Sequence, residues 1–195
     1  TATSTNSEAY SGGICGKNEG SIENCSIGDN NIITSTSEDS EALSGGICGY
    51  NDDEDSIKDC SIGDNNIITA TSKSRFARSG GICGGNYNSI KDCSIGDNNI
   101  ITATSTNSFA ESGGICGKNE GSIENCSIGN NNIITATSED RIARSGGICG
   151  VNYGESITDC SIGSENTITA TSDTDLAQSG GICGKNEGSI ENCSI

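Results

Sequence analysis

The sequence predicts an all-β fold: a right-handed parallel β-helix (β-solenoid) with three strands in each of about six coils. One motif, GGICGKNEGSIENCSIG in its first copy at residues 12–28, returns six times with a period of 33 to 35 residues. The apolar pieces are short, rich in Ile, Thr and Cys, and separated by Gly, Asn or Asp. Only six of the 195 residues are aromatic, which suits a thin interior shared between stacked repeats. Residues 1–195 are therefore predicted to form a single solenoid domain.

Each repeat contains three strand-like pieces, which read SGGICG, SIENCSI and NNIITATS. In a β-helix each piece pairs with its equivalent one coil on, about 4.8 Å away. The hexapeptide after TATS varies except for an Ala at its fifth place, so we expect an exposed loop whose Ala points back to the core. The hexapeptides are Thr5–Tyr10, Glu38–Leu43, Lys73–Arg78, Thr106–Glu111, Glu139–Arg144 and Asp173–Gln178.

The turn before each NNIITATS piece carries glycine and asparagine. We expect the glycines to take positive φ where the chain changes direction, and the asparagines to form ladders along the axis. The glycines are Gly28, Gly63, Gly96, Gly129 and Gly163, and the asparagines include Asn30, Asn31, Asn65, Asn66, Asn98 and Asn99.

The composition excludes several classes of function. The formal net charge of −17 disfavours nucleic acid and anionic membrane surfaces as partners, and no apolar run approaches the ~20 residues of a membrane span. The charge indicates solubility, with weak cation binding as the alternative. Without His, no imidazole acid–base chemistry is available, and the carboxylates recur in every coil instead of converging once. We expect no enzyme activity and no cofactor.

Charged residues are concentrated in two kinds of loop. The stretch Asp52, Asp53, Glu54 and Asp55 could bind Ca²⁺ through its oxygens, but a solvated loop is the simpler interpretation. Four arginines occupy the variable hexapeptides of two repeats, where they could bind an anion, although we expect them to offset neighbouring acids. They are Arg75, Arg78, Arg141 and Arg144.

Twelve cysteines fall as two in each coil, 10 to 12 residues apart. If both point inward near a corner, one disulfide could staple each coil, which would require an oxidising compartment. The alternatives are two ladders of buried free thiols, or an outward GGIC cysteine available for cross-linking subunits. The pairs are Cys15/Cys25, Cys48/Cys60, Cys83/Cys93, Cys116/Cys126, Cys149/Cys160 and Cys183/Cys193. Zinc is not expected, because there is no His and no Cys-x-x-Cys.

The residues of IITATS alternate in direction if the piece is a strand. With Ile33 in the core, position 35 and Ser37 also face inward, while Ile32, Thr34 and Thr36 face solvent. Two columns of threonines are then expected on one flat face, or else Thr serves only as a good strand residue. These candidate site residues are Thr1, Thr3, Thr34, Thr36, Thr69, Thr71, Thr102, Thr104, Thr135, Thr137, Thr169 and Thr171.

The GGICG and SIENCSIG pieces resemble the GLUG repeat of bacterial surface proteins, with its Gly-Gly-apolar-apolar-Gly opening and its Ile-x-x-Cys second strand. The resemblance covers about half of every repeat, and departs from the family where Cys15 and its equivalents replace an aliphatic residue. It implies a secreted or cell-surface module of the kind found in adhesin-like proteins. The Thr-x-Thr array separately resembles the ice-binding faces of antifreeze β-solenoids.

We therefore expect an extracellular or cell-surface protein with a structural or adhesive function, as a segment or subunit of a surface fibre or stalk. The alternative is an ice-binding (antifreeze) protein that uses the Thr-x-Thr face. The sequence opens within a TATS piece and closes within an NCSI piece. Because the repeats are interrupted at these two places, we expect the two ends of the solenoid either to join further repeats or to stack head to tail on other copies. The other possible partner is a surface ligand or ice. We expect no nucleic acid partner, no insertion into a membrane and no bound metal.

Overall fold

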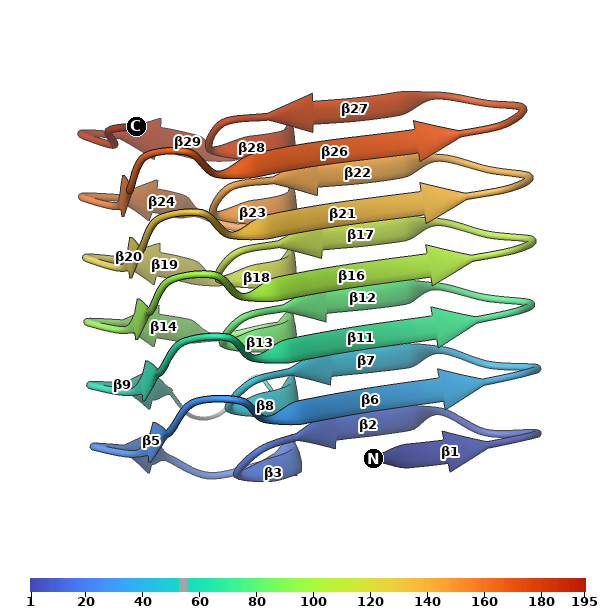
Figure 1. Cartoon of the computed structure of the whole chain (residues 1–195), viewed down its shortest axis with the longest axis horizontal. Helices are drawn as coiled ribbons and strands as arrows, with labels where there is room; N and C mark the ends of the chain where they lie inside the picture. The colour runs from blue at the N-terminus through green and yellow to red at the C-terminus, as the bar shows by residue number, and fades with distance from the viewer. Residues whose placement is uncertain (53–55) are drawn as a thin grey trace.

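The computed structural model describes residues 1–52 and 56–195, and these form a solenoid of stacked parallel coils (Figure 1). Among the described residues every strand pairing is parallel and no residue lies in a helix. The predicted fold class is confirmed, but each turn of the solenoid passes through five sheets instead of three. We name them sheets A to E in the order in which the chain enters them.

Sheets A and B come first in each repeat. Sheet A contains β1 (Ala2–Ser4), β6 (Ile32–Ser37), β11 (Ile67–Ser72), β16 (Ile100–Ser105), β21 (Ile133–Ser138) and β26 (Thr167–Ser172). Sheet B contains β2 (Ala9–Gly12), β7 (Ala42–Gly45), β12 (Ala77–Gly80), β17 (Ala110–Gly113), β22 (Ala143–Gly146) and β27 (Ala177–Gly180). We number the coils 1 to 6 by these sheet B strands.

Sheets C, D and E complete each turn. Sheet C contains β3 (Cys15–Asn18), β8 (Cys48–Asn51), β13 (Cys83–Asn86), β18 (Cys116–Asn119), β23 (Cys149–Asn152) and β28 (Cys183–Asn186). Sheet D contains β4 (Ile22–Glu23), β9 (Ile57–Lys58), β14 (Ser89–Lys91), β19 (Ser122–Glu124), β24 (Ser156–Thr158) and β29 (Ser189–Glu191). Sheet E contains β5 (Ser26–Ile27), β10 (Ser61–Ile62), β15 (Ser94–Ile95), β20 (Ser127–Ile128) and β25 (Ser161–Ile162).

The two extra strands arise from bends inside two of the predicted pieces. SIENCSI is divided between sheets D and E by Asn24, whose φ of 53° is left-handed, and Asn or Asp takes the same conformation at this place in each of the other coils. SGGICG is divided between sheets B and C, since the sheet B strand ends at the first glycine and the chain bends at the second glycine and the Ile, as at Gly13 and Ile14. The Ala of the variable hexapeptide opens the sheet B strand, so the exposed loop is shorter than predicted.

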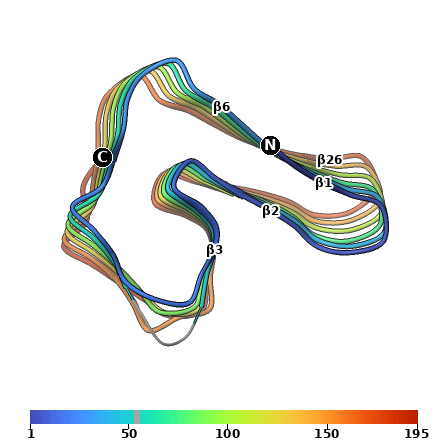
Figure 2. The same cartoon turned by 90° about the horizontal axis from the view of Figure 1, so that it is seen from below.

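Viewed along the axis, the coils nearly superimpose, and each has a body with a flat arm (Figure 2). The arm consists of sheets A and B lying side by side, with a core of small side chains such as Ala70, Ala77 and Ala103. The body holds a larger core of Ile and Cys from all coils, including Ile22 and Ile33. Both isoleucines are buried, as their place in the pattern predicts. The interior is thin and contains no aromatic side chain among its buried residues.

The turn glycines do not have the predicted conformation. No described glycine has positive φ, and the left-handed residue of this turn is instead Asn30 and its equivalents Asn65, Asn98 and Asn131. Glycine is needed for space: a Cβ on Gly63 would lie 2.1 Å from Asp29 Oδ1 of the preceding coil. The turn is therefore set by close coil-to-coil approach and by the tolerance of Asn for left-handed backbone.

Two asparagine ladders run along the axis. The predicted one uses the second Asn of each pair: Asn66 Oδ1 accepts the N–H of Asn31 at 2.8 Å, and Asn99 Oδ1 accepts that of Asn66 at 2.8 Å. The other ladder is buried and does not follow from the sequence pattern. In it Asn18 Nδ2 donates to Asn51 Oδ1 at 2.8 Å, and the same bond repeats at each following coil junction. Every donor in this buried ladder points toward the next coil.

Glu165 stands where the other coils have a left-handed Asn, and its φ is 59°. Because left-handed backbone is costly for Glu and tolerated by Asn, we expect Glu165→Asn to stabilise the fold by about 1 kcal/mol. The reverse change in coil 5, Asn131→Glu, should destabilise by a similar amount. Urea unfolding midpoints of both variants check the pair. A destabilised Glu165→Asn would contradict the backbone explanation.

Candidate functional site

Sheet A presents a flat outer face that carries the predicted threonines. Burial along β6, β11, β16 and β21 alternates, with Ile33, position 35 and Ser37 buried while Thr34 and Thr36 stay partly exposed. The strands pair in register, so that Thr69 lies opposite Thr34 and Thr102, and the same holds for the second column. At the ends of the sheet Thr3 pairs with Thr36, and Thr169 and Thr171 lie on β26. Thr1 precedes β1.

A third outward column lies beside the threonines. It consists of isoleucines with exposed fractions of 69% at Ile32 and 37% to 43% at Ile67, Ile100 and Ile133, with Thr167 in the last strand. The strands of sheet A contain only Ile, Thr, Ala and Ser. In a chain with a net charge of −17, this face is therefore uncharged and mixes methyl groups with hydroxyls.

The arm holds this face flat through its small interior and its buried serines. Ser37 Oγ donates to Ser7 O at 2.9 Å, and Ser72 Oγ donates to Ser40 O at 2.7 Å. From sheet B, Ser44 Oγ donates to Ile33 O at 3.3 Å. These hydroxyls join sheet A to its loops and to sheet B, which satisfies polar groups that would otherwise be unpaired inside the arm.

The disulfide expected within each coil is not formed. Cys15 and Cys25 are both free thiols, because Cys15 opens the sheet C strand whereas Cys25 lies at the bend between sheets D and E. Cys15 Sγ lies 3.5 Å from Cys48 Sγ of the next coil, and Cys25 Sγ donates to the backbone carbonyl of Glu23 at 3.3 Å. All twelve cysteines lie within the described residues, and no two of their sulfurs are at bonding distance. The other expected disulfides are not formed either, and their cysteines are free thiols: Cys48/Cys60, Cys83/Cys93, Cys116/Cys126, Cys149/Cys160 and Cys183/Cys193.

The thiols form two axial columns instead. The GGIC cysteines stack in register along sheet C, where Cys83 pairs with Cys48 and Cys116. The second column follows the bend between sheets D and E, and its inner members such as Cys60 and Cys93 are buried. This arrangement matches the alternative of buried thiol ladders. The end coils are the exception, since Cys15, Cys25, Cys183 and Cys193 are only partly buried.

The outward GGIC cysteine is also not observed. Ile47 and Cys48 are adjacent in sequence, yet both are fully buried. The chain bends into the interior between sheets B and C, so this segment is covered on both sides (Figure 2). Burial raises the pKa of Cys83 and Cys149 well above the usual value for a thiol. These thiols stay neutral near pH 7 and behave as small hydrophobes.

Between sheets B and C lies a crease whose side chains differ from coil to coil. The sheet B column reads Tyr10, Leu43, Arg78, Glu111, Arg144 and Gln178, and the sheet C column reads Lys17, Tyr50, Gly85, Lys118, Val151 and Lys185. Side chains of the two columns pack against each other: a Cβ on Gly85 would lie 2.9 Å from Leu43 Cδ2. The crease is a second packed region outside the main core.

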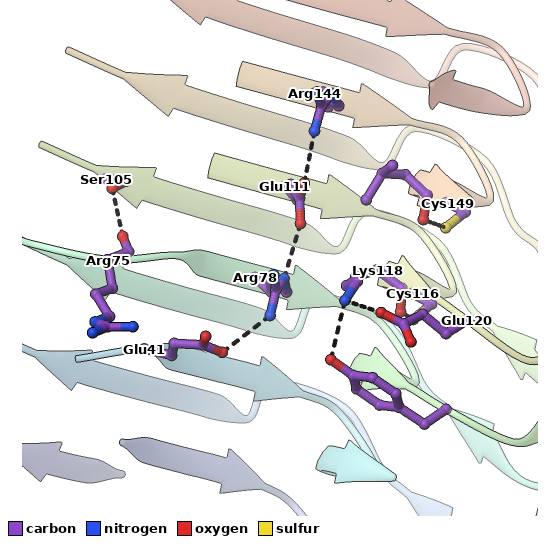
Figure 3. Close-up of polar contacts among 12 residues, drawn as sticks. Glu41, Arg75, Arg78, Ser105, Glu111, Cys116, Lys118, Glu120, Arg144 and Cys149 are labelled. Carbon is purple, nitrogen blue, oxygen red and sulfur yellow. Dashed lines mark hydrogen bonds and ion pairs between the residues drawn. The ribbon is translucent and has the colours of Figure 1, made fainter. Parts of the chain in front are cut away.

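A ladder of alternating charge runs through the crease (Figure 3). The guanidinium of Arg78 donates to Glu41 Oε2 at 3.0 Å and to Glu111 Oε2 at 2.9 Å. Arg144 donates to Glu111 Oε1 at 3.0 Å and to Gln178 Oε1 at 3.1 Å. The exposed fractions of the Arg78, Glu111 and Arg144 side chains are 5%, 3% and 8%.

Two of the four hexapeptide arginines therefore offset acids as expected. Arg78 and Arg144 lie in sheet B strands, whereas Arg75 and Arg141 are exposed in the loops. In Figure 3 only the backbone carbonyl of Arg75 takes part, accepting from Ser105 Oγ at 2.8 Å. The sequence carries one signal of this ladder, which is the alternation of sign from Arg78 through Glu111 to Arg144, one residue before each Ser-Gly-Gly.

Aromatic rings and lysines complete the crease. Tyr50 stacks on Tyr10 with centroids 5.4 Å apart and packs against Tyr87 at 5.0 Å. The ammonium of Lys118 lies 4.9 Å from the Tyr87 centroid and donates to its hydroxyl at 3.1 Å. Burial, with Glu8 and Glu41 nearby, raises the pKa of Tyr10 to about 12. Two further rings lie against the charge ladder: the guanidinium carbon of Arg78 is 4.4 Å from the Phe76 centroid, and that of Arg144 is 5.5 Å from the Phe109 centroid.

The described residues contain no cluster of three or more side chains that could bind a metal ion. Of the predicted acidic loop, Asp53, Glu54 and Asp55 lie outside the described residues, and Asp52 Oδ2 lies 3.0 Å from Lys17 Nζ. No helix of the described chain is long and apolar enough to cross a membrane. No protein-family model, curated protein sequence or solved structure matches the chain.

Proposed function

We propose that the chain is a structural β-solenoid that serves as a segment or subunit of an extracellular fibre or stalk, extended by stacking of coil on coil. The observation that carries this proposal is the in-register pairing of all five sheets from coil to coil. Its working surfaces are the two axial faces of a coil, which offer unpaired strand groups to a further coil. The partner coil belongs either to the same chain or to another copy.

The stacking is directional, which supports head-to-tail over head-to-head addition. In the buried ladder each Asn donates from Nδ2 toward the following coil and accepts at Oδ1 from the preceding one. An aspartate ladder at the same turn also has one direction, since Asp64 N donates to Asp29 Oδ1 of the preceding coil at 2.8 Å and Asp97 N donates to Asp64 Oδ1 at 2.8 Å. A coil added in the same orientation meets donors with acceptors, whereas a reversed coil does not.

The extracellular location and the adhesive function rest on the resemblance of GGICG and SIENCSIG to GLUG repeats. The net charge of −17 is compatible with this proposal, because it slows lateral clumping of rods and leaves axial addition to the paired backbone. A surface ligand would bind along the variable loops, which differ between coils at residues such as Arg75 and Arg141.

Axial assembly is tested with the 195-residue chain by light scattering and electron microscopy. We expect rods longer than one chain, and a change of Ile190→Lys should shorten them, because it places a charge on the axial face of coil 6, where Ile190 is 37% exposed. The matched control is Ile100→Lys on the lateral face, where Ile100 is 38% exposed and its strand is paired on both sides, and this change should leave rod length unchanged. A strictly monomeric chain at all concentrations would contradict axial assembly.

Ice binding by sheet A is the second candidate. It is favoured by one specific observation: an uncharged flat face with two in-register columns of threonines. The columns repeat about every 4.8 Å along the axis and are about 6.7 Å apart across it. Such a regular array of methyl and hydroxyl groups can order water in a lattice over the whole face.

Thermal hysteresis and ice-crystal shape test this candidate. If sheet A binds ice, Thr104→Tyr should remove most of the hysteresis, because a ring at the centre of the face interrupts the flat array. The control Thr158→Tyr lies on sheet D and should have no effect. Absence of hysteresis in the unchanged protein would reject ice binding and leave the structural proposal intact.

A further inference from the structure

The buried columns of this solenoid are almost identical from coil to coil. Sheet by sheet the buried positions repeat as Ile, Cys, Ala, Ser or Asn, and apart from Ser35, which Ala replaces in later coils, the variation falls in the crease. There Leu43, Arg78, Glu111 and Arg144 succeed one another in sheet B, and Val151 is buried where coil 3 has Gly85. Elsewhere in the interior, equivalent positions of the coils carry the same residue.

Such repetition creates a specific hazard. A chain that slips by one coil, or that stacks on a second copy one coil out of phase, still pairs all five sheets and aligns every Ile and Cys column. Sequence identity therefore leaves the order of the coils poorly determined by the main core. The covalent connection sets the neighbours of each coil within one chain, but it does not prevent stacking on a second copy or across a looped-out repeat. A buried feature that differs between neighbouring coils can disfavour these errors.

We propose that the charge ladder of the crease selects the partner coil. The charges of Arg78, Glu111 and Arg144 alternate in sign from coil 3 to coil 5, and in coil 2, where this column has Leu43, Glu41 from two residues earlier pairs with Arg78. A one-coil slip among these coils has one of two results. A coil stacks on the same coil of a second copy, or it stacks on the coil two places away, and in either case the two facing side chains have the same sign of charge. Arginine then meets arginine, or glutamate meets glutamate, at positions with 3% to 8% of the side chain exposed for Arg78, Glu111 and Arg144.

The burial of the ladder makes this selection strong. Like charges brought together at a buried junction repel each other strongly, whereas the native junctions have bonds of 2.9 to 3.0 Å between guanidinium and carboxylate. Exposed pairs such as Lys91 and Glu124, with 39% and 44% of the side chains exposed, are screened and discriminate little. The inference shares coil-on-coil stacking with the proposed function, but within one chain it needs no second copy.

The test compares three versions of the ladder in the full chain. Two neutral versions, Arg78→Gln/Glu111→Gln/Arg144→Gln and Arg78→Met/Glu111→Leu/Arg144→Met, remove the alternation, and the second leaves no buried polar group unpaired. A reversed version, Glu41→Arg/Arg78→Glu/Glu111→Arg/Arg144→Glu, keeps the alternation with opposite signs. Equal amounts of unlabelled and ¹⁵N-labelled protein are unfolded, refolded together and treated with a lysine cross-linker.

Mass spectrometry then counts mixed-isotope links from Lys91 to Lys91. This link reports coil 3 stacked on coil 3 of another copy, because Lys91 lies opposite Lys58 and Glu124 at native junctions. Head-to-tail addition of whole chains does not produce it, so failure of fibre assembly leaves the readout intact. We expect both neutral versions to raise the link at least about tenfold over the unchanged chain, and the reversed version to stay at the unchanged level. Equal link counts in all versions that fold, or a high count in the reversed version, would overturn the proposal.

Discussion

The structure depends on backbone hydrogen bonds that run from each coil to the next. At the start of sheet A, for example, Ile67 N donates to Asn31 O and Ile100 N donates to Asn66 O, both at 2.8 Å. In this pairing each residue lies opposite its equivalent one repeat away. The residue type at each position of the repeat therefore recurs in every coil, and equivalent residues form a column along the axis.

Columns of like residues explain most other features of the molecule. Small residues stack into a thin arm, thiols stack on thiols, and each amide of Asn51 or Asn86 both donates and accepts along the axis. Charge is the exception, because a buried column of one sign would repel itself. The chain resolves this by alternating Arg78, Glu111 and Arg144, so that this buried ionic column also distinguishes neighbouring coils.

Much of the fold could be predicted from the sequence, and the physical reason differs from element to element. The period indicates stacking, and the alternation in IITATS predicts that Ile33 is inside and Thr34 outside. The bends could not be predicted, because the sequence gives no sign that Asn24 interrupts the strand. Its φ of 53° is left-handed and divides SIENCSI into two strands. The inward turn of SGGICG also buries both Ile47 and Cys48, which no strand alternation allows. Sequence spacing likewise suggests a partner for each thiol within its own coil, since it does not show that the equivalent thiol of the next coil lies against it.

Backbone hydrogen bonds join residues one repeat apart throughout sheet A, as from Ile100 to Asn66. Couplings measured by NMR across hydrogen bonds detect these junctions directly. The account predicts correlations from the amide nitrogen of Ile100 to the carbonyl carbon of Asn66 and from Ile133 to Asn99, where the N···O distances are 2.8 and 2.9 Å. Correlations within a repeat, as in an antiparallel hairpin, or rapid hydrogen exchange throughout the IITATS strands of the inner coils, would contradict it.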